Sequence, residues 1–496
     1  MPADSSRLAS RLKDLLRSSV TPGAGPSMVP PLEVDAEAAA PSVERRDGDD
    51  DEVPLAGDLA AGCVVMERYY RFDQLHGTLR VGHYAEAVEG CLSTLAVLGG
   101  DQRAVVEAGR ARVPRLRFEP DRAVADEAPR SDAPTRGPLL FFDLETTGLS
   151  GGAGTMAFLV GCGAFDDAGF RVVQYFLSGY HAERDLLATL ATVAEQYGGL
   201  VSFNGRTFDV PLIQTRYQFH RLPSPFGEMA HFDMLHPARR LWKRRGEAGS
   251  GRGPDHRPDH LEPSSCSLGA LEEAILGVHR VGDVPGAEIP ARYFQFLRTR
   301  DVRPLQPVFE HNRLDLLSLA ALTAVGMRII DGGVDAVSSP HEAIAVGQMF
   351  ERLGRSAEAE AHFERAATLA WPAQSTPSPG REVRADVRAE ALCRLAEHRR
   401  RQHRHGAAAE AWSGVLEASP GQVLAQQARR ALAIHHEHRA RDLDAARSLV
   451  VGALEVERDP AEIDALRHRL ARLDRKRQAG SGAAPRHREC GGTSRP

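Results

Sequence analysis

The chain has 496 residues, of which 42% are hydrophobic and 26% charged, and its formal net charge at pH 7 is −5. This composition is ordinary for a globular protein of about two to four domains, and no apolar run approaches the roughly 20 residues that a membrane helix needs. The 6 cysteines form no C-x-x-C pair, which argues against a disulfide framework or a zinc knuckle, and the lack of an apolar leader predicts a cytoplasmic location.

The N-terminal part of the chain shows little regular periodicity. Residues 1–55 are rich in Ala, Pro, Ser and acidic residues, a composition that predicts a disordered arm. Residues 56–136 contain several aromatic residues and a helical pattern near residues 84–98, and they end in a polar run that contains prolines. We therefore expect an N-terminal extension that packs on the following domain, and then a linker.

Residues 137–330 have the pattern of one α/β domain. The apolar run at residues 138–143 is typical of a buried strand. Two β-like runs, residues 157–165 and 170–177, are separated by Asp-Asp-Ala-Gly and so predict a hairpin. A further strand is expected at residues 200–203, where an Asn-Gly turn follows. Helices are expected at residues 183–196, 209–219, 267–276 and 313–327.

Residues 340–472 are rich in Ala and Arg, and their periodicity predicts helices throughout. Small and aromatic residues recur as in the roughly 34-residue helix pair of tetratricopeptide repeats, so we expect an all-α domain of such repeats, with a generic helical bundle as the alternative. Residues 473–496 are expected to be a disordered tail. The repeat-like positions are Val346, Gly347, Phe350, Gly354, Ala359, Phe363 and Ala366.

Two acidic residues lie at the end of the first strand expected in the α/β domain. Asp143 and Glu145 are two residues apart, so in a strand their side chains share a face. Carboxylates are rarely buried unless they are paired or bound to a metal, and adjacent anions repel each other unless a cation lies between them. Because Mg²⁺ prefers oxygen ligands, this pair is a candidate metal site, although a lone Asp-x-Glu is more often a solvated turn.

Two later acidic motifs strengthen the interpretation of the first. Asp209 follows a strand and an Asn-Gly turn and begins a helix, where it could also be a simple N-cap. His311 and Asp315 are four residues apart and share a helix face, where they could also form an ordinary surface pair. Taken together, the three motifs predict one acidic site assembled from distant parts of the sequence.

The three motifs resemble those of the DEDD 3′→5′ exonuclease superfamily in type and in order. Along the chain they read Asp-x-Glu, Asn-Gly-x-x-Phe-Asp and His-x-x-x-Asp. Within this superfamily, residues 137–325 are most similar to the YprB-type ribonuclease H-like family, a likeness that extends to the segments 232–243, 266–272 and 283–290. The resemblance implies an α/β ribonuclease H-like domain, with a mixed central sheet flanked by helices, followed by the all-α repeat domain.

The resemblance also implies a chemistry for the site. Asp143, Glu145, Asp209 and Asp315 would bind two Mg²⁺ or Mn²⁺ ions about 3.5–4 Å apart for phosphodiester hydrolysis. His311 would orient or deprotonate the attacking water. In the exonuclease pattern a Tyr lies four residues before the last Asp, or a His lies five before it, whereas His311 lies four before Asp315. The role of His311 as the base therefore does not follow from the family pattern alone.

Substrate contacts are predicted from residues close to these motifs. The segment 239–245 is strongly basic and contains Trp242, a combination suited to a single strand of nucleic acid, unless Trp242 belongs to the core and the basic side chains are simply solvated. For Phe208, burial in the core is favoured over stacking on a base. The predicted nucleic-acid-binding residues are Thr146, Thr147, Gly148, Leu149, Asn204, Phe208, Arg239, Arg240, Lys243 and Arg244.

The sequence therefore predicts a metal-dependent 3′→5′ exonuclease that acts on DNA or RNA 3′ ends, with a protein partner for the helical repeats and no membrane association. Two alternatives remain at this level. The nuclease-like domain could be an inactive nucleic-acid-binding scaffold, or the repeats could make the protein chiefly an adaptor. The choice between DNA and RNA depends on contacts to the 2′-hydroxyl, which the sequence does not place.

Overall fold

The computed structural model describes residues 57–60, 62–89, 92–99, 139–148, 154–227, 229–243, 265–370, 381–418 and 422–481. The arm predicted at residues 1–55, the expected linker and the end of the expected tail lie outside these residues. The chain divides into two compact units, which meet in the sequence at Gly332 and Gly333. No helix within the described ranges is both long and apolar enough to cross a membrane.

The first unit contains a mixed sheet of seven strands within the described residues, in the order β1-β2-β7-β6-β5-β8-β9. Neighbours from β1 to β5 are antiparallel, whereas β5, β8 and β9 are parallel. The hairpin predicted from the Asp-Asp-Ala-Gly turn is β6 and β7. The strands are β1 (Gly57–Ala60), β2 (Cys63–Arg71), β5 (Leu139–Thr146), β6 (Ala157–Phe165), β7 (Gly169–Leu177), β8 (Gly199–Ser202) and β9 (Ala230–Asp233), with a separate ribbon of β3 (Leu75–His76) and β4 (Leu79–Arg80).

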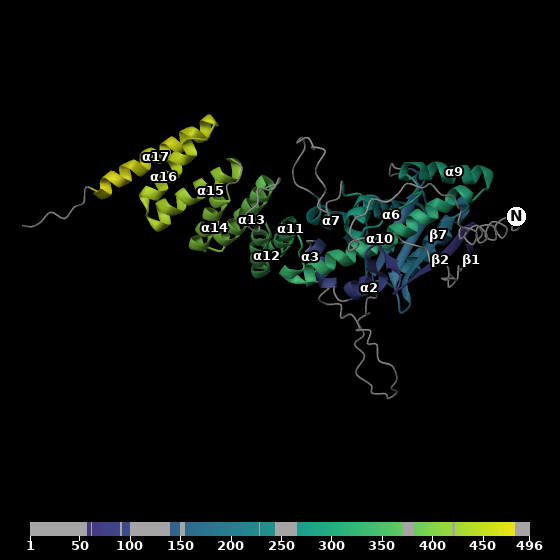
Figure 1. Cartoon of the computed structure of the whole chain (residues 1–496). Coiled ribbons are helices and arrows are strands. Elements are labelled where there is room, and N and C mark those ends of the chain that lie inside the picture. Colours follow the sequence, from purple (N-terminus) through teal and green to yellow (C-terminus); the bar gives the residue numbers. More distant parts are fainter. Residues whose placement is uncertain are drawn as a thin grey trace, which may run out of the picture. The chain divides into compact units, whose positions relative to one another are not determined.

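Strands β1 and β2 belong to this sheet, although the sequence analysis placed residues 56–136 before the α/β domain. Strand β2 pairs with β7 along its whole length, from Cys63 opposite Leu177 to Arg71 opposite Gly169. Val64 and Met66 point into the same apolar cluster as residues of the later helices. The extension therefore provides part of the core, and the two helices after it, α2 (Val81–Glu89) and α3 (Leu92–Gly99), pack on α10 (Gln306–Asp331) (Figure 1).

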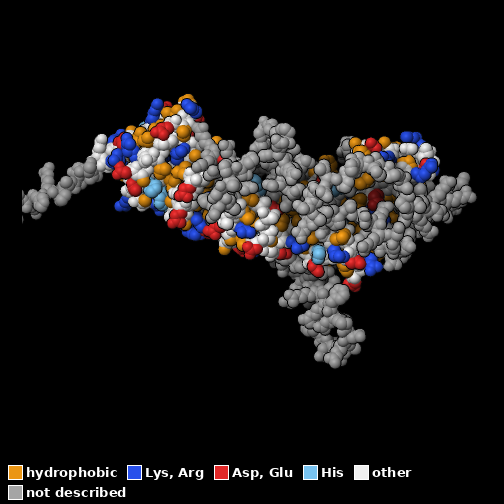
Figure 2. Space-filling model, viewed as in Figure 1, with side chains coloured by type: hydrophobic (Ala, Val, Ile, Leu, Met, Phe, Trp, Pro, Cys, Tyr) orange, Lys and Arg blue, Asp and Glu red, His pale blue; other side chains and the backbone are white. Residues whose placement is uncertain are grey.

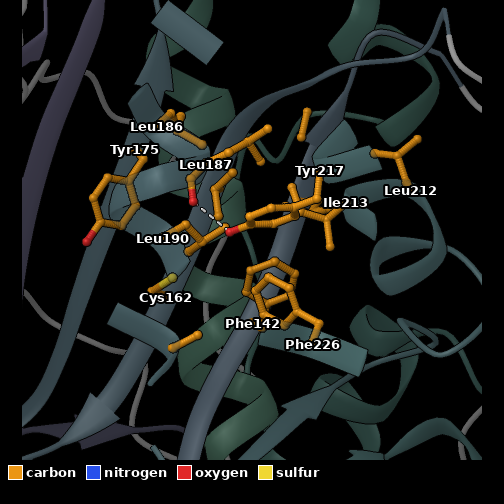
Figure 3. Close-up of a cluster of buried hydrophobic side chains, with 14 of the residues drawn as sticks. Phe142, Cys162, Tyr175, Leu186, Leu187, Leu190, Leu212, Ile213, Tyr217 and Phe226 are labelled. Atoms are coloured by element: carbon orange, nitrogen blue, oxygen red, sulfur yellow. Dashed lines mark hydrogen bonds between the residues drawn. The ribbon is translucent and has the colours of Figure 1, made fainter. Parts of the chain in front are cut away.

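One face of the sheet is covered by α5 (Glu183–Ala194) and α6 (Asp209–Phe219). Alternate residues of β5, among them Phe142, point into this layer, as expected for the two-residue period of a strand. The Tyr217 hydroxyl donates to the Leu187 carbonyl (2.7 Å) and so satisfies the one polar atom that this ring brings into the cluster (Figure 3). The layer fixes α6, whose first residue is Asp209.

The opposite face of the sheet is covered by α9 (Ile289–Thr299) and the first part of α10. Tyr293 stacks on Phe158 with ring centroids 4.1 Å apart and donates its hydroxyl proton to the Leu177 carbonyl. Helix α10 also contacts β5, β6 and β7, and this brings its N-terminal half against the strand that carries Asp143. Shorter helical segments in this unit are α7 (Leu235–Leu241), α8 (Leu268–Leu271), η1 (Tyr180–Ala182), η2 (Pro225–Gly227), η3 (Glu272–Leu276), η4 (Gly286–Glu288) and η5 (Arg303–Leu305). Segment η3 continues directly from α8, and η6 (Gly333–Asp335) belongs to the second unit.

The second unit is helical in all of its described secondary structure. Ion pairs connect side chains of different helices, among them Arg447 with Asp474, and Figure 2 shows Lys and Arg beside Asp and Glu on the face of this unit in view. Helix α17 continues beyond residue 472, where the tail was expected to begin, because Leu473 is fully buried against Ala446 and Val450. The helices are α11 (Pro340–Arg352), α12 (Ser356–Leu369), α13 (Arg381–Arg401), α14 (His405–Glu417), α15 (Gln422–His435), η7 (His436–Ala440), α16 (Leu443–Leu454) and α17 (Pro460–Ser481).

A buried ion pair ties α5 to α6. Arg216 donates two hydrogen bonds of 2.6 Å to the Glu183 carboxylate, and both side chains are 4% exposed. His220 Nε2 lies 2.6 Å from the same carboxylate. Removing one partner of a buried ion pair leaves the other charge buried without compensation, and this lowers the free energy of unfolding.

We expect Arg216→Leu to lower the free energy of unfolding by about 3–5 kcal/mol, because Glu183 would stay buried with only His220 beside it. A guanidinium titration followed by circular dichroism measures this change. Arg292→Leu is the matched control. Arg292 pairs with Glu288 at a more exposed site, where losing the pair should lower the free energy of unfolding by only about 0–1 kcal/mol. Equal losses in the two variants would contradict the importance assigned to the buried pair.

Candidate active site

Strand β5 carries the first two candidate ligands on the face that looks toward α10. Asp143 lies opposite Gly161 of β6, and the Asn312 side chain donates a 2.7 Å hydrogen bond to Asp143 Oδ2. Glycine is required at this position, because a Cβ on Gly161 would lie 2.4 Å from the Asn312 oxygen. Asn312 is itself held by Gln174, which donates to its oxygen at 2.8 Å. Asn312 therefore fixes the orientation of Asp143, a role that the sequence analysis did not assign.

The electrostatic environment shows that the four predicted carboxylates lie close together. Burial and then the charges of Asp315, Glu145 and Asp209 raise the pKa of Asp143 well above its usual value, against the hydrogen bond from Asn312. Burial, followed by the charges of Asp315, Asp209 and Asp283, likewise raises the pKa of Glu145. Three elements distant in the sequence, β5, α6 and α10, therefore place their carboxylates at one site.

Asp209 is brought to the site by the turn between β8 and α6. Burial and then the charge of Asp233 raise the pKa of Asp209 to about 7, and Asp315 adds to the effect. Asn204 adopts a left-handed conformation (φ 66°), which Asn tolerates better than most residues. The next residue, Gly205, leaves room for Asp209, because a Cβ there would lie 2.8 Å from Asp209 Oδ2. The turn thus has a backbone shape that lets the second acidic motif reach the first.

Asp233, at the end of β9, stabilises this turn. Its carboxylate accepts hydrogen bonds from the backbone N–H groups of Asn204 (2.7 Å), Arg206 (3.0 Å) and Leu235 (3.1 Å). Asp233 was part of the segment that carried the family resemblance, but no role was assigned to it. A signal was present in the sequence, since a buried acidic residue at the end of a strand must find donors.

On α10, His311 and Asp315 face the same side, as their spacing predicted. His311 Nε2 lies 3.6 Å from Asp315 Oδ2, and His311 Nδ1 lies 2.7 Å from Asp283 Oδ1. Burial alone would raise the pKa of Asp283, but the hydrogen bond and charge of His311, with the charge of Arg280, hold that pKa below its usual range. Arg280 also contacts Asp315 (2.5 Å) and Glu272. Asp283, Arg280 and Glu272 were not predicted as site residues.

The substrate contacts expected beside the first motif lie around the end of β5. Thr146 donates its hydroxyl proton to the Gly148 carbonyl, and Thr147 makes two hydrogen bonds to the backbone of Met156. Thr146, Thr147 and Gly148 are partly exposed, and Leu149 lies outside the described residues. These residues therefore form a turn next to Glu145 that hydrogen bonds hold in place.

The other expected contacts differ in accessibility. Phe208 is 55% exposed, so the favoured interpretation of this ring as a core residue is wrong. Arg239, Arg240 and Lys243 are exposed, and Arg244 lies outside the described residues. Arg240 donates toward the carbonyls of Leu98 and Gly99. Trp242 is only 6% exposed, so the interpretation of this ring as a stacking platform is wrong and the core alternative is confirmed.

The carboxylate set fits a hard divalent cation by its chemistry. Asp143, Glu145 and Asp209 have raised pKa values and lie near Asp315, so a multiply charged cation would stabilise their ionised forms, and oxygen ligands suit Mg²⁺ and Mn²⁺. As the side chains lie, no three His, Cys, Asp or Glu residues in the described part of the chain are arranged to hold a metal ion. Two of the carboxylates have other partners here, since Asn312 contacts Asp143 and Arg280 contacts Asp315.

Comparison with known proteins identifies a related domain in the first unit. Residues 140–325 match the model of the RNase_H superfamily. The first unit contains a ribonuclease H-like domain. The chain is also 34% identical over 229 residues to a protein of Bacillus subtilis (strain 168) described as uncharacterized protein YprB, a match that covers 46% of this chain and 51% of that protein. The chain thus matches about half the length of this relative.

Asp209→Asn should make the stability of the metal-free protein less dependent on pH. A carboxyl group whose pKa is raised from 3.8 to about 7 by folding contributes stability below pH 4, and this contribution is lost as pH rises through 7. The loss is on the order of 4 kcal/mol, because each pKa unit corresponds to about 1.4 kcal/mol. Thermal unfolding in EDTA between pH 4 and 8 measures it.

In that experiment Asp209→Asn should be more stable than the wild type at pH 8 and similar to it near pH 4. Asp185→Asn, at an exposed position on α5, provides the control and should follow the wild type. Parallel curves for Asp209→Asn and the wild type would show that Asp209 does not carry the unfavourable charge.

Proposed function

We propose that the ribonuclease H-like domain is a metal-dependent 3′→5′ exonuclease of the DEDD type, which hydrolyses phosphodiester bonds of DNA or RNA, preferentially single-stranded. The observation that carries the proposal is the convergence of Asp143, Glu145, Asp209 and Asp315, whose mutual repulsion calls for divalent cations. Two Mg²⁺ or Mn²⁺ ions, when bound, would favour deprotonation of the attacking water and balance the charge on the leaving 3′ oxygen. The products would be nucleoside 5′-monophosphates.

The contacts of His311 support its role as the general base. Both Asp283 and Arg280 lie near His311 Nδ1, but the Asp283 oxygen is closer, at 2.7 Å against 3.4 Å. A protonated Nδ1 that donates to Asp283 leaves Nε2, the nitrogen nearer Asp315, with its lone pair in the neutral ring. That nitrogen can accept a proton from water beside the carboxylates. The register of His311 relative to Asp315 is therefore compatible with its proposed role.

Substrate binding would involve the rim of the same site. The turn formed by Thr146, Thr147 and Gly148 lies directly after Glu145 and is suited to backbone contacts with a terminal nucleotide. The exposed ring of Phe208 lies next to Asp209, where a base could stack on it, and Asn204 belongs to the same turn. Arg239, Arg240 and Lys243 provide exposed positive charge for the phosphates further along the strand.

We expect the full chain with Mn²⁺ to shorten 5′-labelled single-stranded DNA or RNA stepwise from the 3′ end. Asp315→Asn should lower the rate by about 10³-fold or more, because it removes a charged ligand from the site. Product ladders on denaturing gels measure both effects. Asp335→Asn, outside the carboxylate cluster, should cleave like the wild type. Cleavage of neither polymer by the wild type would favour the alternative of an inactive, nucleic-acid-binding scaffold.

Asp283→Ala should lower kcat by about 10–100-fold with little change in KM, because the ring of His311 would lose the partner that orients it. Steady-state kinetics on an oligonucleotide measure the two constants separately. Asp283→Glu should recover part of the activity by restoring an acceptor. Asp301→Ala, which removes a carboxylate paired with Arg303 in the same domain, is the control. An effect on KM alone would contradict a positioning role.

For the second unit we propose tetratricopeptide-like helix pairs that bind a protein partner. Val346, Ala359 and Phe363 are fully buried, as the repeat pattern requires. Where α11 packs on α12, a Cβ on Gly347 would lie 2.6 Å from the ring of Phe363. The small residue thus lets the two helices pack tightly. The adaptor alternative assigns the main function to this unit, and the cytoplasmic location stays a prediction.

A further inference from the structure

A buried histidine of the N-terminal ribbon contacts α10, the helix that carries His311 and Asp315. His76 ends β3, and its side chain is buried, as is that of Ser318 on α10. Nε2 of His76 lies 2.8 Å from the Ser318 hydroxyl, three residues beyond Asp315 in the sequence. The ribbon lies outside residues 140–325, which match the model of the RNase_H superfamily. The N-terminal extension therefore reaches the helix of the candidate site.

Backbone contacts hold the ribbon against η3. The N–H of Thr78 donates to the Leu276 carbonyl (2.9 Å). Gly77 adopts a left-handed conformation (φ 64°), and a Cβ there would lie 2.1 Å from the Leu276 carbonyl oxygen, so this close approach requires glycine. Tyr84 of α2 donates its hydroxyl proton to the His76 carbonyl (2.5 Å). The position of His76 is thus fixed by contacts with both η3 and α2.

Ser318 connects His76 to a buried carboxylate. Burial and then the charge of Arg280 lower the pKa of His76 to about 4, so its ring is neutral and carries one N–H. Burial raises the pKa of Glu272, whereas Arg280 and the hydroxyl of Ser318 act to lower it. Glu272 Oε2 is buried, and no other described residue donates to it. When His76 Nε2 donates to Ser318, the hydroxyl proton of Ser318 is free to point toward this oxygen.

The same carboxylate holds a guanidinium that contacts the candidate site. The side chain of Arg280 is 9% exposed, and its Nη2 contacts both Glu272 and Asp315 Oδ1, the latter at 2.5 Å. Its Nη1 lies 3.4 Å from Asp283 Oδ2 and 3.4 Å from His311 Nδ1. Polar contacts therefore run without a break from the N-terminal ribbon to the side chains of α10. In order, they pass through His76, Ser318, Glu272 and Arg280.

We propose that His76 is a positioning residue for the reaction, and that the N-terminal ribbon belongs to the catalytic domain. Through Ser318, Glu272 and Arg280 it fixes the orientation of the site residues on α10. Buried polar networks of this kind are rigid when every member has a partner, and removal of one member loosens the others. The inference rests on the proposed nuclease activity. It assigns to the extension an effect on kcat, because loss of orientation slows the reaction more than it weakens substrate binding.

Steady-state cleavage of a single-stranded oligonucleotide by the full chain with Mn²⁺ tests the proposal. His76→Ala should lower kcat by about tenfold or more with KM nearly unchanged. His76→Gln should recover most of this loss, because its amide N–H can donate to Ser318 from about the position of Nε2. His83→Ala changes an exposed histidine of α2 and should cleave like the wild type. Circular dichroism at the assay temperature establishes that each variant is folded.

The imidazole of His311 gives a second readout that does not depend on cleavage. With isotopically labelled histidine, the Nδ1–H that we expect to donate to Asp283 should give a low-field proton signal in NMR spectra, assigned by its loss in Asp283→Ala. This signal should shift or broaden in His76→Ala and return in His76→Gln, while His83→Ala leaves it in place.

The outcomes separate this inference from the function on which it rests. An unchanged kcat or an unchanged His311 signal in His76→Ala would overturn the role of His76 and leave the nuclease proposal standing. A kcat for His76→Gln as low as that for His76→Ala would also overturn it, because the hydrogen bond to Ser318 would then not be the cause. If the wild type cleaves neither DNA nor RNA, the nuclease proposal fails, and this inference fails with it.

Discussion

Mutual repulsion among the carboxylates of β5, α6 and α10 is the physical constraint on which the candidate site depends. Asp143, Glu145 and Asp209 lie where burial and neighbouring negative charge both disfavour ionisation. A fold selected for stability alone would separate or neutralise such groups. The protein instead compensates them only in part, through Asn312 at Asp143 and Arg280 at Asp315. The remaining electrostatic cost is the physical basis for the affinity that we propose for divalent cations.

Hydrogen bonds between β7, α10 and β5 fix the orientation of the first carboxylate, Asp143. Gln174 of β7 donates to both the Phe309 carbonyl and the Asn312 side chain, and Asn312 in turn donates to Asp143. This sequence of hydrogen bonds connects three elements, and Gly161 leaves the space through which α10 approaches the sheet. The orientation of Asp143 thus depends on residues that make no contact with a substrate, as expected for a preorganised site.

A similar relation holds between Asp233 and Asp209. Asp233 accepts three backbone hydrogen bonds that stabilise the turn before α6, yet its charge is also a cause of the raised pKa of Asp209. One residue therefore provides local stability and adds to the unfavourable charge of the site. Such a compromise is common where stability and function make different demands on the same side chains.

The sequence by itself determined those features that depend on local spacing. Asp143 and Glu145 share a strand face, and His311 and Asp315 share a helix face, because these relations follow from the periods of strand and helix. The predicted hairpin and the helical character of the second unit rest on the same local rules. The α/β ribonuclease H-like fold was implied by the resemblance of the three acidic motifs to a known family, and it is confirmed.

Only the tertiary structure decided the relations between residues distant in the sequence. The pairing of β2 with β7, the contact of Asn312 with Asp143, and the positions of Asp283 and Arg280 beside α10 depend on chain topology, which no local period encodes. Trp242 and Phe208 are both aromatic residues beside polar motifs, but the tertiary structure buries the side chain of Trp242 and leaves that of Phe208 exposed. A residue's type and spacing indicate which chemistry it can perform, whereas its partners and exposure result from the packing of the whole domain.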